Sequence, residues 1–149
     1  MKLLRRLART KNKAVLVSTH KLDLALQMAD FIWLAYKNQS ILTGIPEDLV
    51  LNGAFDDVFQ FKGFDLKTGK VQHEAHLGWK AHLTGAPGHI FLWTKNALER
   101  MGFEVIESPA PTTIAIDQHA QQPTWVIEGK RFSSIHLLMQ YLLIHRASA

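Results

Sequence analysis

The sequence contains no cysteine among its 149 residues, so it holds neither a disulfide framework nor a thiolate metal site. No apolar run approaches the roughly 20 residues that a membrane-spanning helix needs. Residues 1–6 lack the apolar segment of a signal peptide, so none is expected there. Hydrophobic residues make up 47% of the chain, which is enough to form a core in one domain or two small ones.

Acidic residues are absent from residues 1–22, which carry seven lysines and arginines. The other 127 residues carry ten basic and thirteen acidic side chains, so the positive net charge of +4 belongs to this one segment. A solvated helix with cations near its C-terminal end explains the segment. A nucleic-acid-binding arm is an alternative, but no aromatic residue lies between the basic ones. A mitochondrial presequence also fits, although the segment continues directly into an apolar stretch.

A short apolar run, residues 14–18, is followed by His20 and then by a helical pattern over residues 22–28. A continuous apolar run of this length is typical of a strand buried on both faces of a parallel sheet. Ligands bind beyond the carboxyl ends of such strands, where a neutral imidazole can donate to a phosphate oxygen or hold a water. A histidine after a strand is, however, more often a structural residue.

The next segment predicts two strands, a tight turn and two helices. The strands are expected at residues 31–36 and 40–44, with a turn at residues 37–40. Pro46 starts a helix in which Glu47 and Asp48 suit the positive N-terminal end. A second helix is expected over residues 54–61.

Four stretches in this order resemble the C-terminal third of an ABC transporter ATP-binding subunit, of the type that imports iron-siderophore complexes, haem or cobalamin. They are AVLVSTH ending at His20, LDLALQMAD ending at Asp30, the apolar IWL that follows, and TGIPEDLV ending at Val50. The resemblance covers about residues 1–60. It implies that His20 is the switch histidine of the H-loop, the catalytic residue that contacts the γ-phosphate of ATP and helps to position the attacking water.

The other motifs of that family are absent from the chain. The nine glycines never occur at the spacing of a phosphate loop, and there is no Leu-Ser-Gly-Gly-Gln signature and no apolar strand ending in Asp-Glu. We therefore expect a fragment: a truncated gene, a misplaced start or a split subunit, with Met1 an internal methionine. ATP and Mg²⁺ are implied for the complete subunit only, and the chain alone is expected to be inactive. Lys21 stands where the family usually has an acid.

The resemblance also implies partners and a location. A complete subunit of this type pairs with a second ATPase subunit and with a membrane permease. It is cytoplasmic and lies at the inner face of the membrane. A homodimer is a further expectation, and no nucleic acid is expected as a partner.

The expected fold is α/β, with the C-terminal part of an ABC ATPase sheet in residues 1–61 and an appended small α+β domain in residues 62–149. In this second part, strands are expected at residues 82–85, 103–107, 112–116 and 124–128, with helices over residues 89–101 and from Ser133 or Ser134 to His145. A hairpin is expected at residues 64–73. The four glycine, alanine and proline residues 85–88 read better as a tight turn than as an anion site.

Four histidines, His73, His76, His82 and His89, lie close together in the sequence, but their spacing predicts no metal site. Two other functions remain open. The alternative to the fragment hypothesis is that residues 62–149 act as a stand-alone module that binds a ligand or a protein. Salt-dependent nucleic-acid binding through Arg5, Arg6 and Arg9 is the less favoured alternative.

Overall fold

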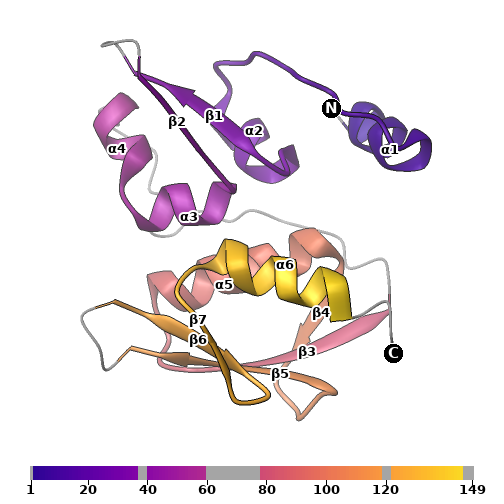
Figure 1. Cartoon of the computed structure of the whole chain (residues 1–149), viewed down its shortest axis with the longest axis vertical. Coiled ribbons are helices and arrows are strands. Elements are labelled where there is room, and N and C mark those ends of the chain that lie inside the picture. Colours follow the sequence, from indigo (N-terminus) through magenta and orange to yellow (C-terminus); the bar gives the residue numbers. More distant parts are fainter. Residues whose placement is uncertain (1, 37–39, 60–77, 119–121, 146–149) are drawn as a thin grey trace.

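The computed structural model describes residues 2–36, 40–59, 78–118 and 122–145, without the side chains of Lys2, Asp57 and Phe59. Within these ranges the helices and strands form two groups, one before residue 60 and one after residue 77 (Figure 1). The expected boundary near residues 61–62, the turn at residues 37–40 and the hairpin at residues 64–73 fall wholly or mainly outside the described residues. The division into domains stays a prediction.

The first group contains four short helices and one hairpin. The helices are α1 (Lys2–Lys11), α2 (Leu22–Met28), α3 (Pro46–Leu51) and α4 (Ala54–Phe59). Strands β1 (Ile32–Ala35) and β2 (Ile41–Gly44) pair antiparallel, with Trp33 opposite Thr43. Helix α3 begins at Pro46, as its sequence predicts, with Glu47 and Asp48 in its first turn.

The strand expected at residues 14–18 does not form. These residues are extended but pair with no described strand, and Leu16 is 80% exposed. The prediction of a buried strand is therefore wrong for this structure, because burial on two faces requires neighbouring strands, which the described residues do not provide.

The second group forms a five-stranded sheet in the order β4-β3-β5-β6-β7. Its strands are β3 (Trp79–Thr84), β4 (Phe103–Ile106), β5 (Thr112–Asp117), β6 (Thr124–Ile127) and β7 (Lys130–Phe132). Strand β3 runs parallel to β4 and β5, whereas β6 and β7 are antiparallel additions. The α/β fold expected from the sequence is confirmed.

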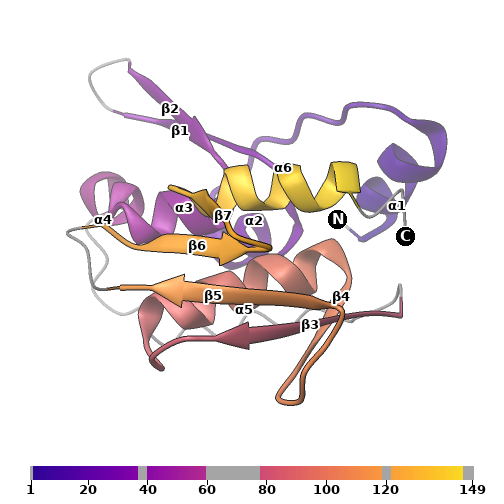
Figure 2. The ribbon, with the colours of Figure 1, turned by 60° about the horizontal axis from the view of Figure 1, so that its bottom comes forward.

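Helices α5 (His89–Met101) and α6 (Ile135–His145) cover one face of this sheet. The elements of the first group lie on the far side of the two helices, so the helices form a middle layer (Figures 1 and 2). Helix α5 ends where predicted, because Gly102 adopts the left-handed conformation, with φ of 101°.

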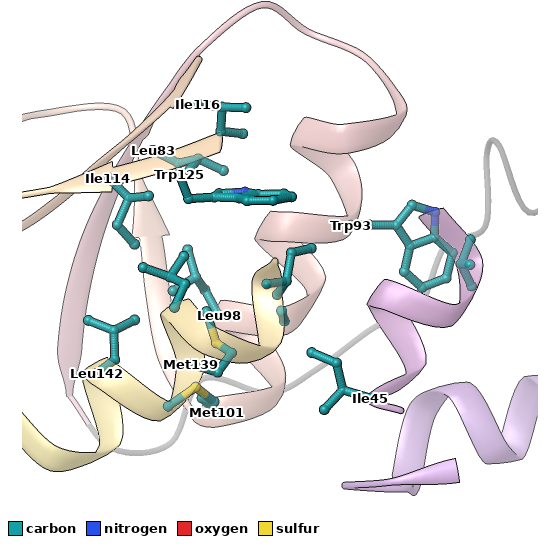
Figure 3. Packing of buried hydrophobic residues seen from close by; sticks show 14 of the residues in the cluster. Ile45, Leu83, Trp93, Leu98, Met101, Ile114, Ile116, Trp125, Met139 and Leu142 are labelled. Carbon is teal, nitrogen blue, oxygen red and sulfur yellow. The ribbon is translucent and has the colours of Figure 1, made fainter. Parts of the chain in front are cut away.

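One continuous core joins the sheet, the middle helices and α3. Trp125, Ile114 and Leu83 on the sheet face Leu98 of α5 and Met139 of α6 (Figure 3). On the opposite side of α5, Trp93 packs toward the first group, and Ile45 beside α3 belongs to the same buried cluster (Figure 3). The two groups therefore share buried apolar surface.

Candidate functional site

His20 lies in a bend between the extended residues 14–19 and helix α2. The Lys21 amide donates to Thr19 Oγ1 over 3.1 Å, which shapes the bend. The His20 side chain is exposed and has no hydrogen bond or ion pair in the described part of the chain. His20 thus lies directly before a helix, as the order of the sequence patterns predicts.

A polar junction connects the two groups of elements. The guanidinium of Arg100, in the last turn of α5, donates to both carboxylate oxygens of Glu47 on α3, over 2.7 and 2.9 Å. Both residues are buried, at 6% and 1% exposure. Burial lowers the pKa of Arg100, but the Glu47 carboxylate, with Asp30 and Asp48, outweighs burial and holds that pKa above its ordinary value.

Asp48, the residue after Glu47, binds the other helix of the middle layer. Its two carboxylate oxygens accept from the backbone amides of Ile135 and His136, over 3.0 and 2.9 Å, at the first turn of α6. Those amides have no partner within the helix, so Asp48 satisfies them from another element. Burial raises the pKa of Asp48, although the two amides act in the opposite direction.

Asp30, just beyond α2, lies close to three arginines of the junction. Its Oδ1 lies 3.4 Å from Arg5, 3.3 Å from Arg9 and 3.5 Å from Arg100. Burial lowers the pKa of Arg5, and the neighbouring Arg9 adds to this effect. Two of the basic residues at the N-terminus therefore serve an internal contact, which favours the helix interpretation of the basic segment.

The other features singled out in the sequence have structural roles or lie outside the description. His73 and His76 are outside the described residues, and His82 and His89 lie on β3 and at the start of α5. Gly85 lies in the turn between β3 and α5, where a Cβ atom would meet the Ile116 side chain at 3.0 Å. This close approach supports the tight-turn interpretation. No helix in the described ranges is long and apolar enough to cross a bilayer.

Sequence reasoning noted Glu47 and Asp48 only as acids suited to the start of a helix. Their partners lie 53 and 87 residues further on, and no local pattern links them. The sequence around Arg100 does contain one indication of a buried ion pair. It follows Ala97 and Leu98 and precedes Met101, so it occupies the buried side of an amphipathic helix, where an arginine needs a carboxylate.

Phosphoryl transfer needs phosphate-binding amides, a lysine and metal-binding side chains, and the sequence has no phosphate loop. Within the described ranges, no group of three or more His, Asp or Glu residues lies close enough to hold a metal ion. Whatever His20 contributes to such chemistry requires further residues.

The comparisons with known proteins identify the second group of elements. Residues 79–143, from the start of β3 nearly to the end of α6, match the family described as the iron ABC transporter C-terminal domain. No curated protein and no solved structure matches the chain. The match lies in the C-terminal half, for which the sequence alone indicated no family. The resemblance that the sequence did indicate lies in residues 1–60. This match over residues 79–143 supports the resemblance to the C-terminal portion of an ABC transporter subunit.

Proposed function

We propose that this chain works in an ABC importer for iron complexes, haem or cobalamin. In this proposal residues 1–59 supply the His20-bearing part of the ATPase domain. Residues 79–143 are the appended domain of the same subunit. The family match supports the transporter assignment and its iron substrate class. ATP hydrolysis, the role of His20 and the permease partner are our proposals.

The observation that carries the proposal is the exposure of the apolar residues 14–18. This apolar run leads directly into His20, yet Val15, Leu16 and Val17 are 44%, 80% and 41% exposed. An extended apolar segment with unpaired backbone groups is a template for adjoining strands. In the complete ATPase the strands that carry the phosphate loop and the Asp-Glu pair would cover it.

Two neighbouring elements expose apolar surface of the same kind. Helix α1 exposes Leu3, Leu4 and Leu7, at 66%, 38% and 47%. The β1–β2 hairpin exposes Phe31, Trp33, Ile41 and Leu42. Exposed apolar side chains on neighbouring elements are typical of interaction sites when another polypeptide covers them. These exposed apolar side chains lie in the first group, and in this proposal the rest of the ATPase domain covers them.

The experiment has two steps. The DNA upstream of the Met1 codon is translated in every frame to look for a phosphate loop, a signature and an Asp-Glu strand. The encoded polypeptide is then expressed and mixed with this chain, and ATP hydrolysis is measured. We expect no turnover by this chain alone, turnover by the mixture, and loss of turnover but not of complex formation with His20→Ala.

The exposed His145→Ala variant is the matched control and should leave turnover intact. Leu16→Asp should prevent the complex from forming. Micromolar ATP binding with turnover by this chain alone would overturn the fragment proposal. So would a mixture whose turnover is the same with His20→Ala, because His20 would then have no part in the reaction. The alternative of a stand-alone module stays a prediction.

A further inference from the structure

Arg100 contacts several elements besides the one that carries its ion-pair partner. Besides Glu47 on α3, its Nη1 reaches the Ala29 carbonyl over 3.4 Å and Asp30 Oδ1 over 3.5 Å, both just beyond α2. Its own carbonyl accepts from Arg5 of α1 over 3.1 Å. One residue of the second group thus contacts three separate parts of the first group.

Two of those parts flank the His20 segment. Helix α1 ends at Lys11, directly before the extended stretch, and α2 begins at Leu22, directly after the His20 bend. The stretch between them, residues 12–20, is exposed throughout. Its position is therefore set by the two helices, and Arg100 contacts residues of one helix and the end of the other.

The chemistry of the contact favours one geometry over others. A guanidinium that forms two parallel hydrogen bonds with a carboxylate fixes both the distance and the plane of the pair. A buried pair of this kind contributes little net stability, because removing two charges from water costs about as much as their attraction returns. Such a pair instead disfavours other arrangements of the two groups of elements, in which either charge would be buried without its partner.

We infer that Arg100 is a positioning residue through which the C-terminal unit sets the placement of the His20 segment. The inference rests on the proposed function only where it gives this placement a role in ATP hydrolysis. The placement itself can be measured without assuming that function. Any ligand or partner that tilts α5 would move Arg100 and, with it, the ends of both flanking helices. The C-terminal unit would then act on the reaction without contacting ATP.

The placement can be measured in the full chain with a pair of spin labels. The chain has no cysteine, so Asp23→Cys in the first turn of α2 and Glu104→Cys on β4 give two unique, exposed labelling sites. We expect a narrow distance distribution with native Arg100. With Arg100→Lys, which lacks the fork of donors, we expect a distribution at least about twofold broader. Arg131→Lys, in the exposed ion pair with Asp117, is the matched control and should change nothing.

An unchanged distribution in a folded Arg100→Lys variant overturns the inference. If that variant does not fold, Asp30→Asn decides. Asp30 is 61% exposed, so its replacement leaves the core intact while removing the shared partner of three arginines. Broadening then supports the inference and an unchanged distribution overturns it. No ATP is used, so this result is independent of whether His20 acts in hydrolysis.

Discussion

Glu47 and Arg100 face each other across the boundary between the two groups of elements and form two hydrogen bonds, although 53 residues separate them in the chain. Neither side chain has access to water to compensate for the loss of the other. The pair therefore makes the two groups depend on each other. Several consequences can be tested with single substitutions.

Replacing Glu47 by alanine should destabilise the protein strongly. The variant removes the carboxylate that forms two hydrogen bonds with the buried Arg100 guanidinium and leaves Asp30, at 3.5 Å, and Asp48 as weaker counter-charges. Breaking a buried pair in this way costs about 3–5 kcal/mol. Urea unfolding followed by circular dichroism measures the loss. The double variant Glu47→Leu with Arg100→Met should recover most of it, because no charge is then buried. A double variant less stable than Glu47→Ala would show that the pair itself holds the fold.

Replacing Asp48 by alanine should weaken the start of α6. The amides of Ile135 and His136 lose their acceptor, which typically costs about 1–2 kcal/mol for a helix cap. Thermal unfolding measures the change. Glu107→Ala, at an exposed position, is the control and should stay within about 0.5 kcal/mol of the native chain. Equal effects of the two substitutions would contradict the capping role.

The pH dependence of stability should carry the signature of Asp48. Burial raises the pKa of this carboxyl above its ordinary 3.8, so folding favours the protonated form. That contribution is complete below the unfolded-state pKa and is lost as pH rises through the higher folded-state pKa. Relative to Asp48→Asn, the native chain should become less stable as pH rises above 3.8. Urea unfolding of both proteins at a series of pH values tests this, and a native chain that becomes more stable relative to Asp48→Asn as pH rises would refute it.

Thr94→Val should destabilise the C-terminal unit although the two side chains have nearly the same shape. Thr94 Oγ1 accepts from the Trp125 indole over 2.8 Å and donates to the Ile90 carbonyl over 2.8 Å, and both side chains are buried. The variant leaves the indole N–H without an acceptor, at a cost of about 1–3 kcal/mol. Chemical denaturation measures the loss. Thr43→Val on the exposed hairpin should be nearly neutral, and a neutral Thr94→Val would mean that water replaces the lost hydroxyl.

Leu16→Asp should leave stability within about 0.5 kcal/mol of the native value, because Leu16 is 80% exposed. It should also raise solubility, since a charge interrupts an exposed apolar run. Leu26→Asp, at 1% exposure in α2, is the matched contrast and should unfold the protein. A large loss of stability with Leu16→Asp would show that residues 14–18 are buried in solution.

Local patterns predicted most of the helices and strands. Helices α2 and α5 have the predicted bounds, because each has a clear apolar period and α5 ends at a glycine. Ser134 was expected near the start of α6, and its Oγ accepts from the Leu137 amide over 3.2 Å. Strand β7 was missed because three residues after a turn carry no alternation to read.

The relationships between distant elements could not be predicted in the same way. The apolar character of residues 14–18 indicated a buried strand, but the neighbours that bury a strand are not recorded in its own residues. His20 was predicted between a strand and a helix, yet nothing local indicated that Arg100 would contact residues on both sides of it. Contacts over 53 to 95 residues depend on how the layers stack, which one sequence does not record.

The placement of the tryptophans gives the molecule two separate optical reporters. Trp93 and Trp125 are 1% and 2% exposed within the core, whereas Trp33 is 63% exposed on the β1–β2 hairpin. An indole in contact with water emits at longer wavelength and is reached by dissolved quenchers, and a buried one is not. Covering the hairpin with another polypeptide would therefore shift and protect the emission of Trp33 and leave that of Trp93 and Trp125 unchanged. Binding at that surface can be followed by light, without any label, while the core emission reports that the fold is intact.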